Sequence, residues 1–202
     1  MRAAVFSVTQ RGAELSKRIA KAFPEGWEVA QYSFKRYPVQ GAEPFANLAQ
    51  KTAEVFPECN SVVFVCACGI AVRAVAPLIK SKQTDPAVVV LDDCGKFAVS
   101  LLSGHLGGAN RLTEIIAEAV GAQPVITTAT DTGGRFSPDS FAAANSLIFK
   151  DFSVAKEIAS AVLRGEKIGL ISDIECVNTP PDVVHADSGK YGICISRDMS
   201  AK

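Results

Sequence analysis

The feature that most constrains the fold is an alternation, over about the first 130 residues, of short runs rich in β-branched residues with segments of helical periodicity. The clearest run, 62–66, is continuously apolar, as expected of a central parallel strand covered on both faces. The alternation predicts an α/β fold in which a mostly parallel sheet lies between two layers of helices, a three-layer α/β/α sandwich.

The individual elements of this first part follow from the same patterns. Apolar and β-branched runs predict strands at 3–8, 27–34, 62–66, 87–91, 97–102 and 124–127. Helical periodicity predicts helices at 10–23, 45–56, 69–75 and 112–120. The segment 92–96, Asp-Asp-Cys-Gly-Lys, reads as a tight turn, so the strands on either side of it are predicted to pair antiparallel.

A turn-rich segment, Thr-Asp-Thr-Gly-Gly-Arg at 130–135, indicates a linker. We therefore predict a first α/β domain over 1–131 and a second, smaller α/β domain over 135–202. In the second domain, helices are expected to begin at Ser137-Pro138 and after Asp151, the first of them reaching about residue 149. Strands are expected at 168–172, 175–178 and 191–195.

Composition excludes several classes of protein. The 21 basic and 21 acidic side chains cancel, which disfavours binding of nucleic acid or of a membrane surface. The best candidate for a membrane span, 62–79, is interrupted by Arg73 and Pro77. The six cysteines are too scattered for a secreted disulfide scaffold, so we expect a cytoplasmic protein whose thiols mostly act as small buried apolar groups.

The segment 103–110, Ser-Gly-His-Leu-Gly-Gly-Ala-Asn, gathers the most groups with chemical potential. Its glycines permit unusual backbone angles and expose N–H groups at the start of a helix, which favours an anion or oxyanion site. His105 can move protons near neutral pH. The segment also fits a plain turn between strand and helix with a packed histidine. It matches neither Gly-x-Gly-x-x-Gly nor a P-loop, which disfavours nucleotide binding.

Two further loops follow predicted strands, one at 68–73 with Gly69 and Arg73, the other at 127–131 ending in Asp131. Because ligands of open α/β sheets bind beyond the carboxyl ends of the strands, we expect the loops 69–73, 103–110 and 127–131 to converge at one edge. Arg73 also fits an arginine that extends to solvent, and Asp131 also fits an Asx-turn. Thr84 and Asp85 are expected near this cleft, although they also fit a simple entry into the strand at 87–91.

Four blocks in order, 69–73, 82–90, 102–110 and 124–131, together resemble the cobalt-precorrin-5A hydrolase (CbiG) family of anaerobic cobalamin biosynthesis. The resemblance is dense over the first domain and weaker over 135–197, which is similar to the family's small central domain. Members of the family usually continue into a C-terminal domain. We expect that domain to be absent here, either through truncation or because a separate polypeptide supplies it.

The resemblance implies a cobalt-containing contracting tetrapyrrole as substrate, with a δ-lactone that joins the ring A acetate to the extruded meso carbon. Hydrolysis of this lactone in cobalt-precorrin-5A gives cobalt-precorrin-5B and releases acetaldehyde. Cobalt arrives with the substrate, so neither a cofactor nor a protein metal site is expected. The alternative is a non-catalytic tetrapyrrole-binding or carrier module that needs a separate C-terminal domain for activity.

The candidate catalytic residues are His105, as base and proton shuttle, and the carboxylates Asp131 and Asp85. The candidate substrate-binding residues are Gly69, Arg73, Lys80, Thr84, Ser103, Gly104, Gly107, Gly108, Asn110, Thr127 and Thr128. Within this set, the N–H groups of Gly107 and Gly108 are expected to stabilise an oxyanion, and Ser103 or Asn110 to orient the reacting groups. Residues 61–84 carry cations and no acid, which predicts a basic rim for the substrate's carboxylates.

Overall fold

The computed structural model describes residues 1–81, 84–105, 107–128, 135–145, 147–148, 152–177, 179, 182–185 and 191–196. The chain divides into two compact units, Met1–Ile126 and Thr127–Lys202, and each is described by itself. The predicted linker at 130–135 falls almost wholly outside the described residues. No helix among the described residues is long and apolar enough to span a bilayer.

The first unit is built on a seven-stranded sheet in the order β3-β2-β1-β4-β5-β6-β7. Its strands are β1 (Arg2–Ser7), β2 (Glu28–Phe34), β3 (Glu43–Phe45), β4 (Ser61–Val65), β5 (Ala87–Leu91), β6 (Phe97–Leu102) and β7 (Gln123–Val125). Strands β1 to β5 run parallel, whereas β6 pairs antiparallel with β5 and β7 runs parallel to β6. The mostly parallel sheet and the 92–96 hairpin are thus confirmed.

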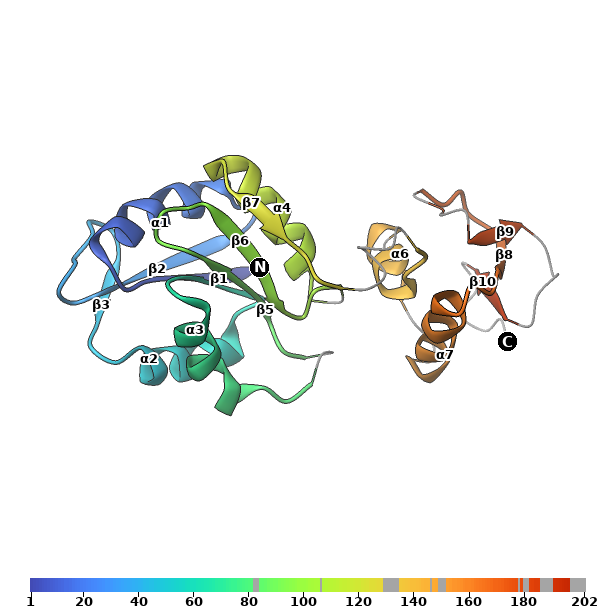
Figure 1. Cartoon of the computed structure of the whole chain (residues 1–202), viewed down its shortest axis with the longest axis horizontal. Helices are drawn as coiled ribbons and strands as arrows, with labels where there is room; N and C mark the ends of the chain where they lie inside the picture. The colour runs from blue at the N-terminus through green and yellow to red at the C-terminus, as the bar shows by residue number, and fades with distance from the viewer. Residues whose placement is uncertain are drawn as a thin grey trace. The chain divides into compact units, whose positions relative to one another are not determined.

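Helices cover both faces of this sheet (Figure 1), which confirms the three-layer α/β/α sandwich. They are α1 (Gln10–Ala22), α2 (Leu48–Val55), α3 (Cys68–Val75) and α4 (Ala109–Val120), with short 3₁₀ turns η1 (Phe56–Glu58) and η2 (Ala76–Leu78). Alternate side chains of β4 serve the two faces: Val63 packs with α1 and α4, and Phe64 packs with α2 and α3. All of β4 is buried, as its continuous apolar run predicts.

The predicted helix at 45–56 begins later than expected. Phe45 lies in β3 and packs edge-on against Phe6, with ring centroids 5.8 Å apart. Helix α2 begins only at Leu48, because the Asn47 side chain caps it by accepting a hydrogen bond from the backbone N–H of Gln50. The start of this helix is therefore set by its capping residue rather than by the first apolar position.

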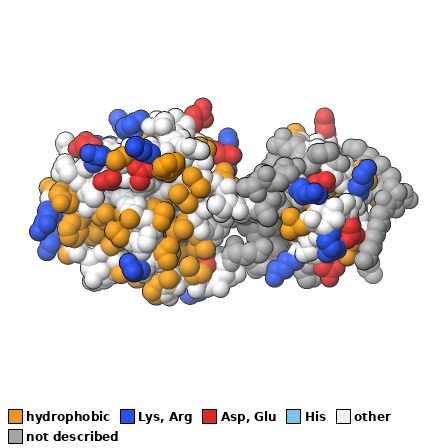
Figure 2. Space-filling view, viewed as in Figure 1, with side chains coloured by type: hydrophobic (Ala, Val, Ile, Leu, Met, Phe, Trp, Pro, Cys, Tyr) orange, Lys and Arg blue, Asp and Glu red, His pale blue; other side chains and the backbone are white. Residues whose placement is uncertain are grey.

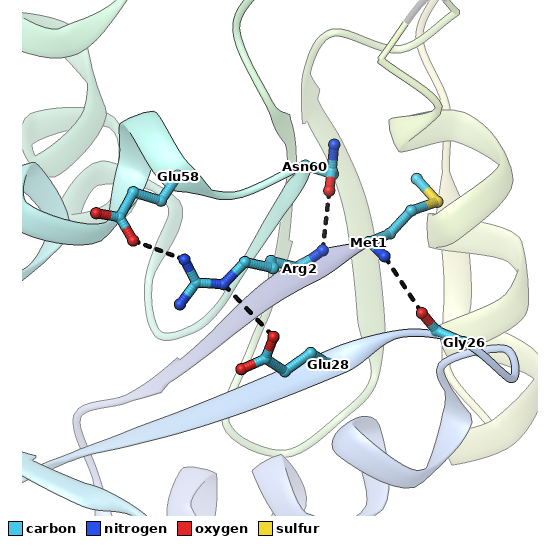
Figure 3. A network of polar contacts seen from close by, with 6 residues as sticks. All are labelled: Met1, Arg2, Gly26, Glu28, Glu58 and Asn60. Carbon is cyan, nitrogen blue, oxygen red and sulfur yellow. Dashed lines mark hydrogen bonds and ion pairs between the residues drawn. The ribbon is translucent and has the colours of Figure 1, made fainter.

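Polar contacts tie the amino ends of the central strands together (Figure 3). The Arg2 guanidinium at the start of β1 donates to Glu58 at 2.6 Å and lies 3.7 Å from the carboxylate of Glu28 at the start of β2. The backbone N–H of Arg2 donates to the side chain of Asn60, whose own carbonyl accepts from Ala87 at the start of β5. The amino edge of the sheet is thus held by contacts between β1, β2, β4 and β5.

The second unit contains α6 (Pro138–Ala144), α7 (Phe152–Leu163) and a parallel three-stranded sheet in the order β10-β8-β9. Its strands are β8 (Ile168–Ser172), β9 (Val183–His185) and β10 (Gly192–Ile195). The predicted strand at 175–178 is wrong over its described residues, because the Asn145 side chain exchanges hydrogen bonds with the backbone N–H and carbonyl of Val177. Asn145 also follows the end of α6, which stops before the predicted position near 149.

We predict that Phe6→Ala lowers the free energy of unfolding of the first unit by about 3–5 kcal/mol. Phe6 is fully buried and stacks between Tyr32 and Phe64, so its loss removes apolar burial and leaves a cavity. Urea titration followed by the fluorescence of Trp27, the chain's one tryptophan, reports on this unit alone.

The matched control is Phe97→Ala, because Phe97 is 48% exposed. It is expected to change the free energy of unfolding by less than about 1 kcal/mol. Equal losses for the two variants would contradict the placement of Phe6 in the core.

Candidate functional site

The direction of β6 decides where the 103–110 segment lies. Strands β4 and β5 run parallel, so the carboxyl end of β4, followed by Gly69, lies at one edge of the sheet. In the antiparallel β6, Leu102 stands opposite Val88, near the start of β5. The loop that follows β6 therefore lies at the opposite, amino edge. The expectation that 69–73 and 103–110 meet at one edge is wrong, because the rule for carboxyl ends was applied to β6 although this strand runs antiparallel to β5.

Arg73 is also separated from the β6–α4 loop by the face of the sheet on which it lies. It is exposed on α3, which covers the face of the sheet opposite to α4. Of the third predicted loop, Thr127 is exposed and Thr128 half-buried, and both belong to the second unit. Asp131 lies outside the described residues. Within the first unit, the structure thus does not bring the loops 69–73 and 103–110 together.

Asp85 holds the amino edge together. Its carboxylate accepts hydrogen bonds from the backbone N–H of Lys80 at 2.9 Å and of Ser81 at 2.9 Å. Its backbone carbonyl accepts one from the hydroxyl of Ser103 at 3.0 Å. The Asp85 side chain is buried, and a buried carboxylate is costly unless it is hydrogen bonded in this way. Lys80, Asp85 and Ser103 therefore form one connected group, with the exposed Thr84 beside them.

The loop 103–108 between β6 and α4 is tightly wound. Ser103 has a φ of +57°, which makes it the one non-glycine residue with positive φ among the described residues. Its carbonyl accepts from the N–H of Ala109, and that of Gly104 accepts from the N–H of Asn110. Backbone strain of this kind costs about 1–3 kcal/mol and persists where the surroundings enforce it. Here the enforcing contacts are the bond to Asp85 and the two bonds to the first turn of α4.

Two glycines of the loop are required by close approach. A Cβ on Gly107 would meet the side chain of Ser103 and lie 2.8 Å from the Ser103 carbonyl. A Cβ on Gly104 would lie 2.7 Å from the Oδ1 of Asn110, which also accepts a hydrogen bond of 2.6 Å from Ser100. The residues named by the sequence pattern are thus packed against one another, and His105, which is half-buried, belongs to the loop that they form.

The availability of backbone N–H groups differs from the prediction. The N–H of Gly108 donates to the carbonyl of His105 at 3.0 Å, so the expected oxyanion role of Gly108 is wrong. The first amides of α4, those of Ala109 and Asn110, are also engaged. The N–H of Gly107 donates to no acceptor among the described residues. It is therefore the donor of the predicted pair that remains for a ligand.

The carboxyl edge holds contacts that sequence reasoning missed. The hydroxyl of Thr9, which caps α1, donates to Asp93 at 3.2 Å, and the Arg11 guanidinium donates to the Sγ of Cys94 at 2.8 Å. These contacts join α1 to the β5–β6 turn. In the sheet, β4 lies between β1, which precedes α1, and β5. Asp92, Asp93 and Cys94 lie close enough to share an ion, but the Asp92 carboxylate accepts from backbone N–H groups of its own turn.

The cysteines are less buried than predicted. Only Cys66 is buried, whereas Cys68, Cys94 and Cys194 are exposed. Burial raises the pKa of the Cys66 thiol to about 11, chiefly because desolvation disfavours the thiolate. Cys68 opens α3 two residues later and remains accessible.

Comparison with known proteins shows which family the chain is similar to. Residues 50–131 match the family model described as cobalamin synthesis G N-terminal. The chain is 37% identical over 174 residues to the cobalt-precorrin-5A hydrolase of Salmonella typhimurium, a match that covers 85% of this chain and 48% of that protein. It is 31% identical over 177 residues to the protein of the same name from Priestia megaterium, covering 84% and 46%.

A solved structure supports the fold. The crystal structure of a cobalamin biosynthesis protein G homolog from Sulfolobus solfataricus superimposes with a TM-score of 0.60 at 23% identity. The similarity covers 99% of this chain and 57% of that chain. The chain thus spans about half the length of the curated relatives that it matches.

We predict that Gly107→Ala destabilises the first unit by about 1–3 kcal/mol, because the added methyl group overlaps Ser103. Gly69→Ala is the matched control, since a Cβ there meets nothing within 4 Å. It is expected to leave stability unchanged or to raise it by up to about 1 kcal/mol, because alanine is the better helix former. Urea titration with Trp27 fluorescence separates the two variants, and equal stability would refute the close packing of the loop.

A second prediction concerns the two neighbouring thiols. Iodoacetamide at pH 8 should label Cys68 and leave Cys66 largely unmodified, since the thiolate is the nucleophile and a pKa of about 11 leaves only about one Cys66 thiol in a thousand ionised. Labelling of Cys66 should rise as the pH is raised toward its pKa. Peptide mass spectrometry gives the extent at each site, and equal labelling at pH 8 would contradict the burial of Cys66.

Proposed function

Because the chain belongs to the CbiG family of cobalamin biosynthesis, we propose that it acts on cobalt-precorrin-5A, opening the ring A δ-lactone with release of acetaldehyde. Water adds to the lactone carbonyl, and the C–O bond breaks to leave a carboxylic acid on ring A and a hydroxyl on the extruded two-carbon fragment. The C–C bond to the macrocycle then breaks as the fragment's C–O bond becomes the carbonyl of acetaldehyde. The bonding electron pair and a proton pass to the macrocycle, giving cobalt-precorrin-5B.

The reaction requires a base for water and a proton carrier for the bond-breaking step. His105 fills both roles, because its imidazole lies in the loop fixed by Ser103 and Asp85. The observation that supports the proposal most strongly is this loop itself. Its strained Ser103 is held in place from two sides, and a histidine and an unengaged glycine amide follow within four residues.

The other residues of the loop have supporting roles. The N–H of Gly107 donates to the oxyanion that forms when water adds to the lactone carbonyl. Asn110 supports the loop from beneath Gly104, and Ser103 fixes it to Asp85. Asp85 is a positioning residue in this scheme rather than an acid or base, because its carboxylate already accepts backbone N–H groups from Lys80 and Ser81.

Binding of the substrate relies on one cation of α3 and one of the α3–β5 connection. Arg73 and Lys80 are exposed, and neither side chain forms an ion pair with another residue that the structure describes. They pair with the peripheral carboxylates of the tetrapyrrole. Cobalt enters as part of the substrate, so no protein ligand to the metal is needed for this step.

The proposal is tested with purified chain and cobalt-precorrin-5A, by coupling acetaldehyde release to its reduction by NADH with added alcohol dehydrogenase. The assay is run with the chain alone and with a polypeptide that supplies the remaining half of the relatives' length. Acetaldehyde in either assay supports the proposal. Tight binding without acetaldehyde in both would overturn it in favour of a carrier module.

We predict that His105→Asn lowers kcat by about 10²–10⁴-fold, because asparagine keeps a hydrogen-bonding group but cannot transfer the proton. The dissociation constant for the substrate should stay within about threefold, since binding relies on Arg73 and Lys80. His185→Asn, which changes the chain's other histidine, is the control and should retain wild-type turnover.

Arg73→Ala is expected to show the opposite pattern, with KM raised about tenfold or more and kcat little changed. Steady-state kinetics on the three variants separates the two roles. Near wild-type turnover of His105→Asn would remove His105 from the mechanism and leave the loop as a binding element.

A further inference from the structure

The outward face of α3 is unusually apolar for an exposed helix. Ile70 is 42% exposed, Val72 44%, and Ile79, just past η2, 44%. The opposite side of α3, with Ala71, Ala74 and Val75, packs on the sheet. Helices at a protein surface ordinarily place polar side chains outward. Figure 2 shows hydrophobic side chains gathered over the part of the first unit where Figure 1 places α3.

The two charged side chains that α3 and the segment after it contribute to this face are both cations. Arg73 lies among the exposed apolar residues and Lys80 directly follows Ile79, whereas no acidic residue occurs between Glu58 and Asp85. Neither cation pairs with another described side chain. The face therefore complements a partner that is apolar over a broad surface and anionic at its rim. A second copy of the chain fits less well, since a two-fold interface centred on α3 would set Arg73 against its own counterpart.

We propose that this α3 platform, defined as Ile70, Val72, Arg73, Ile79 and Lys80, is the surface on which the macrocycle of the tetrapyrrole lies. The apolar side chains contact the flat face of the ring, and the two cations pair with carboxylates at its rim. This inference rests on the proposed function, which supplies the chemical class of the ligand. It adds the surface on which that ligand binds.

Hydrogen bonds through Asp85 connect the platform to the β6–α4 loop. The backbone N–H of Lys80 donates to the carboxylate of Asp85, and the carbonyl of Asp85 accepts from Ser103, the first residue of the loop. A ring bound across α3 with a carboxylate on Lys80 thus has its edge beside the segment that carries His105. This placement explains how Arg73, although away from the carboxyl end of β6, contributes to the same reaction.

The test uses cobalt uroporphyrin III, a stable octacarboxylate of the same shape class, titrated into the full chain and followed by its absorption band. The double variant Ile70→Ser/Val72→Ser should bind about tenfold more weakly than wild type. Phe97→Ser is the matched control, because Phe97 is similarly exposed but lies on β6, and it should bind as wild type does. Arg73→Glu should weaken binding further and reduce its dependence on salt.

Circular dichroism is used to check that each variant is folded, as expected for substitutions at exposed positions. Equal affinity of the double variant and wild type, or no binding by wild type, would overturn the inference. So would a wild-type dimer, seen by light scattering, that the double variant dissociates without a change in affinity for the probe. The acetaldehyde assay separates this inference from the proposed function. If the probe binds in a way that depends on α3 but the chain releases no acetaldehyde, the platform is upheld and the hydrolase activity is rejected. If the double variant releases acetaldehyde with an unchanged KM, the platform alone is rejected.

Discussion

The antiparallel pairing of β6 with β5 is the constraint on which the candidate site depends. The turn between these strands is fixed by Asp92, whose carboxylate accepts hydrogen bonds from the backbone N–H groups of Cys94, Lys96 and Phe97. Because the chain reverses there, the glycine-rich loop after β6 is delivered to the amino edge of the sheet, beside the start of β5. With a parallel β6 the same residues would lie at the other edge, away from Asp85 and Lys80.

Asp85 links the β6–α4 loop to the α3–β5 connection by hydrogen bonds. A buried carboxylate requires hydrogen-bond donors, and here the donors come from the end of the α3–β5 connection. The same residue holds Ser103 through its carbonyl, so the strained loop cannot relax without disturbing the segment that carries Lys80. The amino ends of β1, β2 and β4 are themselves tied by Arg2 and Asn60, which gives this edge a rigid base.

Much of the fold could be predicted from the sequence, because the central strands are apolar runs that only a covered sheet explains. The residues of the β6–α4 loop were also identifiable from their composition. The edge of the sheet at which this loop lies was not predicted correctly, although the hairpin was predicted antiparallel. The rule that ligands bind beyond the carboxyl ends of strands applies only when every strand runs the same way. Two kinds of contact left no sequence signal: the bonds from Lys80 and Ser81 to Asp85, and the overlap that Gly107 avoids with Ser103. Short strands such as β3 and β9 were missed because three residues carry too little periodicity.

The carboxyl edge, where ligands of open α/β sheets usually bind, is partly occupied by the chain itself. Thr9 and Arg11 at the start of α1 bond to Asp93 and Cys94 of the β5–β6 turn, and a Cβ on Gly95 would touch Leu15. The turn is thus held against α1 across the end of β4. We place a large flat ligand along α3, whose outward side is exposed and whose segment, 59–84, carries cations and no acidic residue. Because β6 is antiparallel, the loop that carries His105 lies at the amino edge, where Asp85 connects it to Lys80, the last residue of that surface.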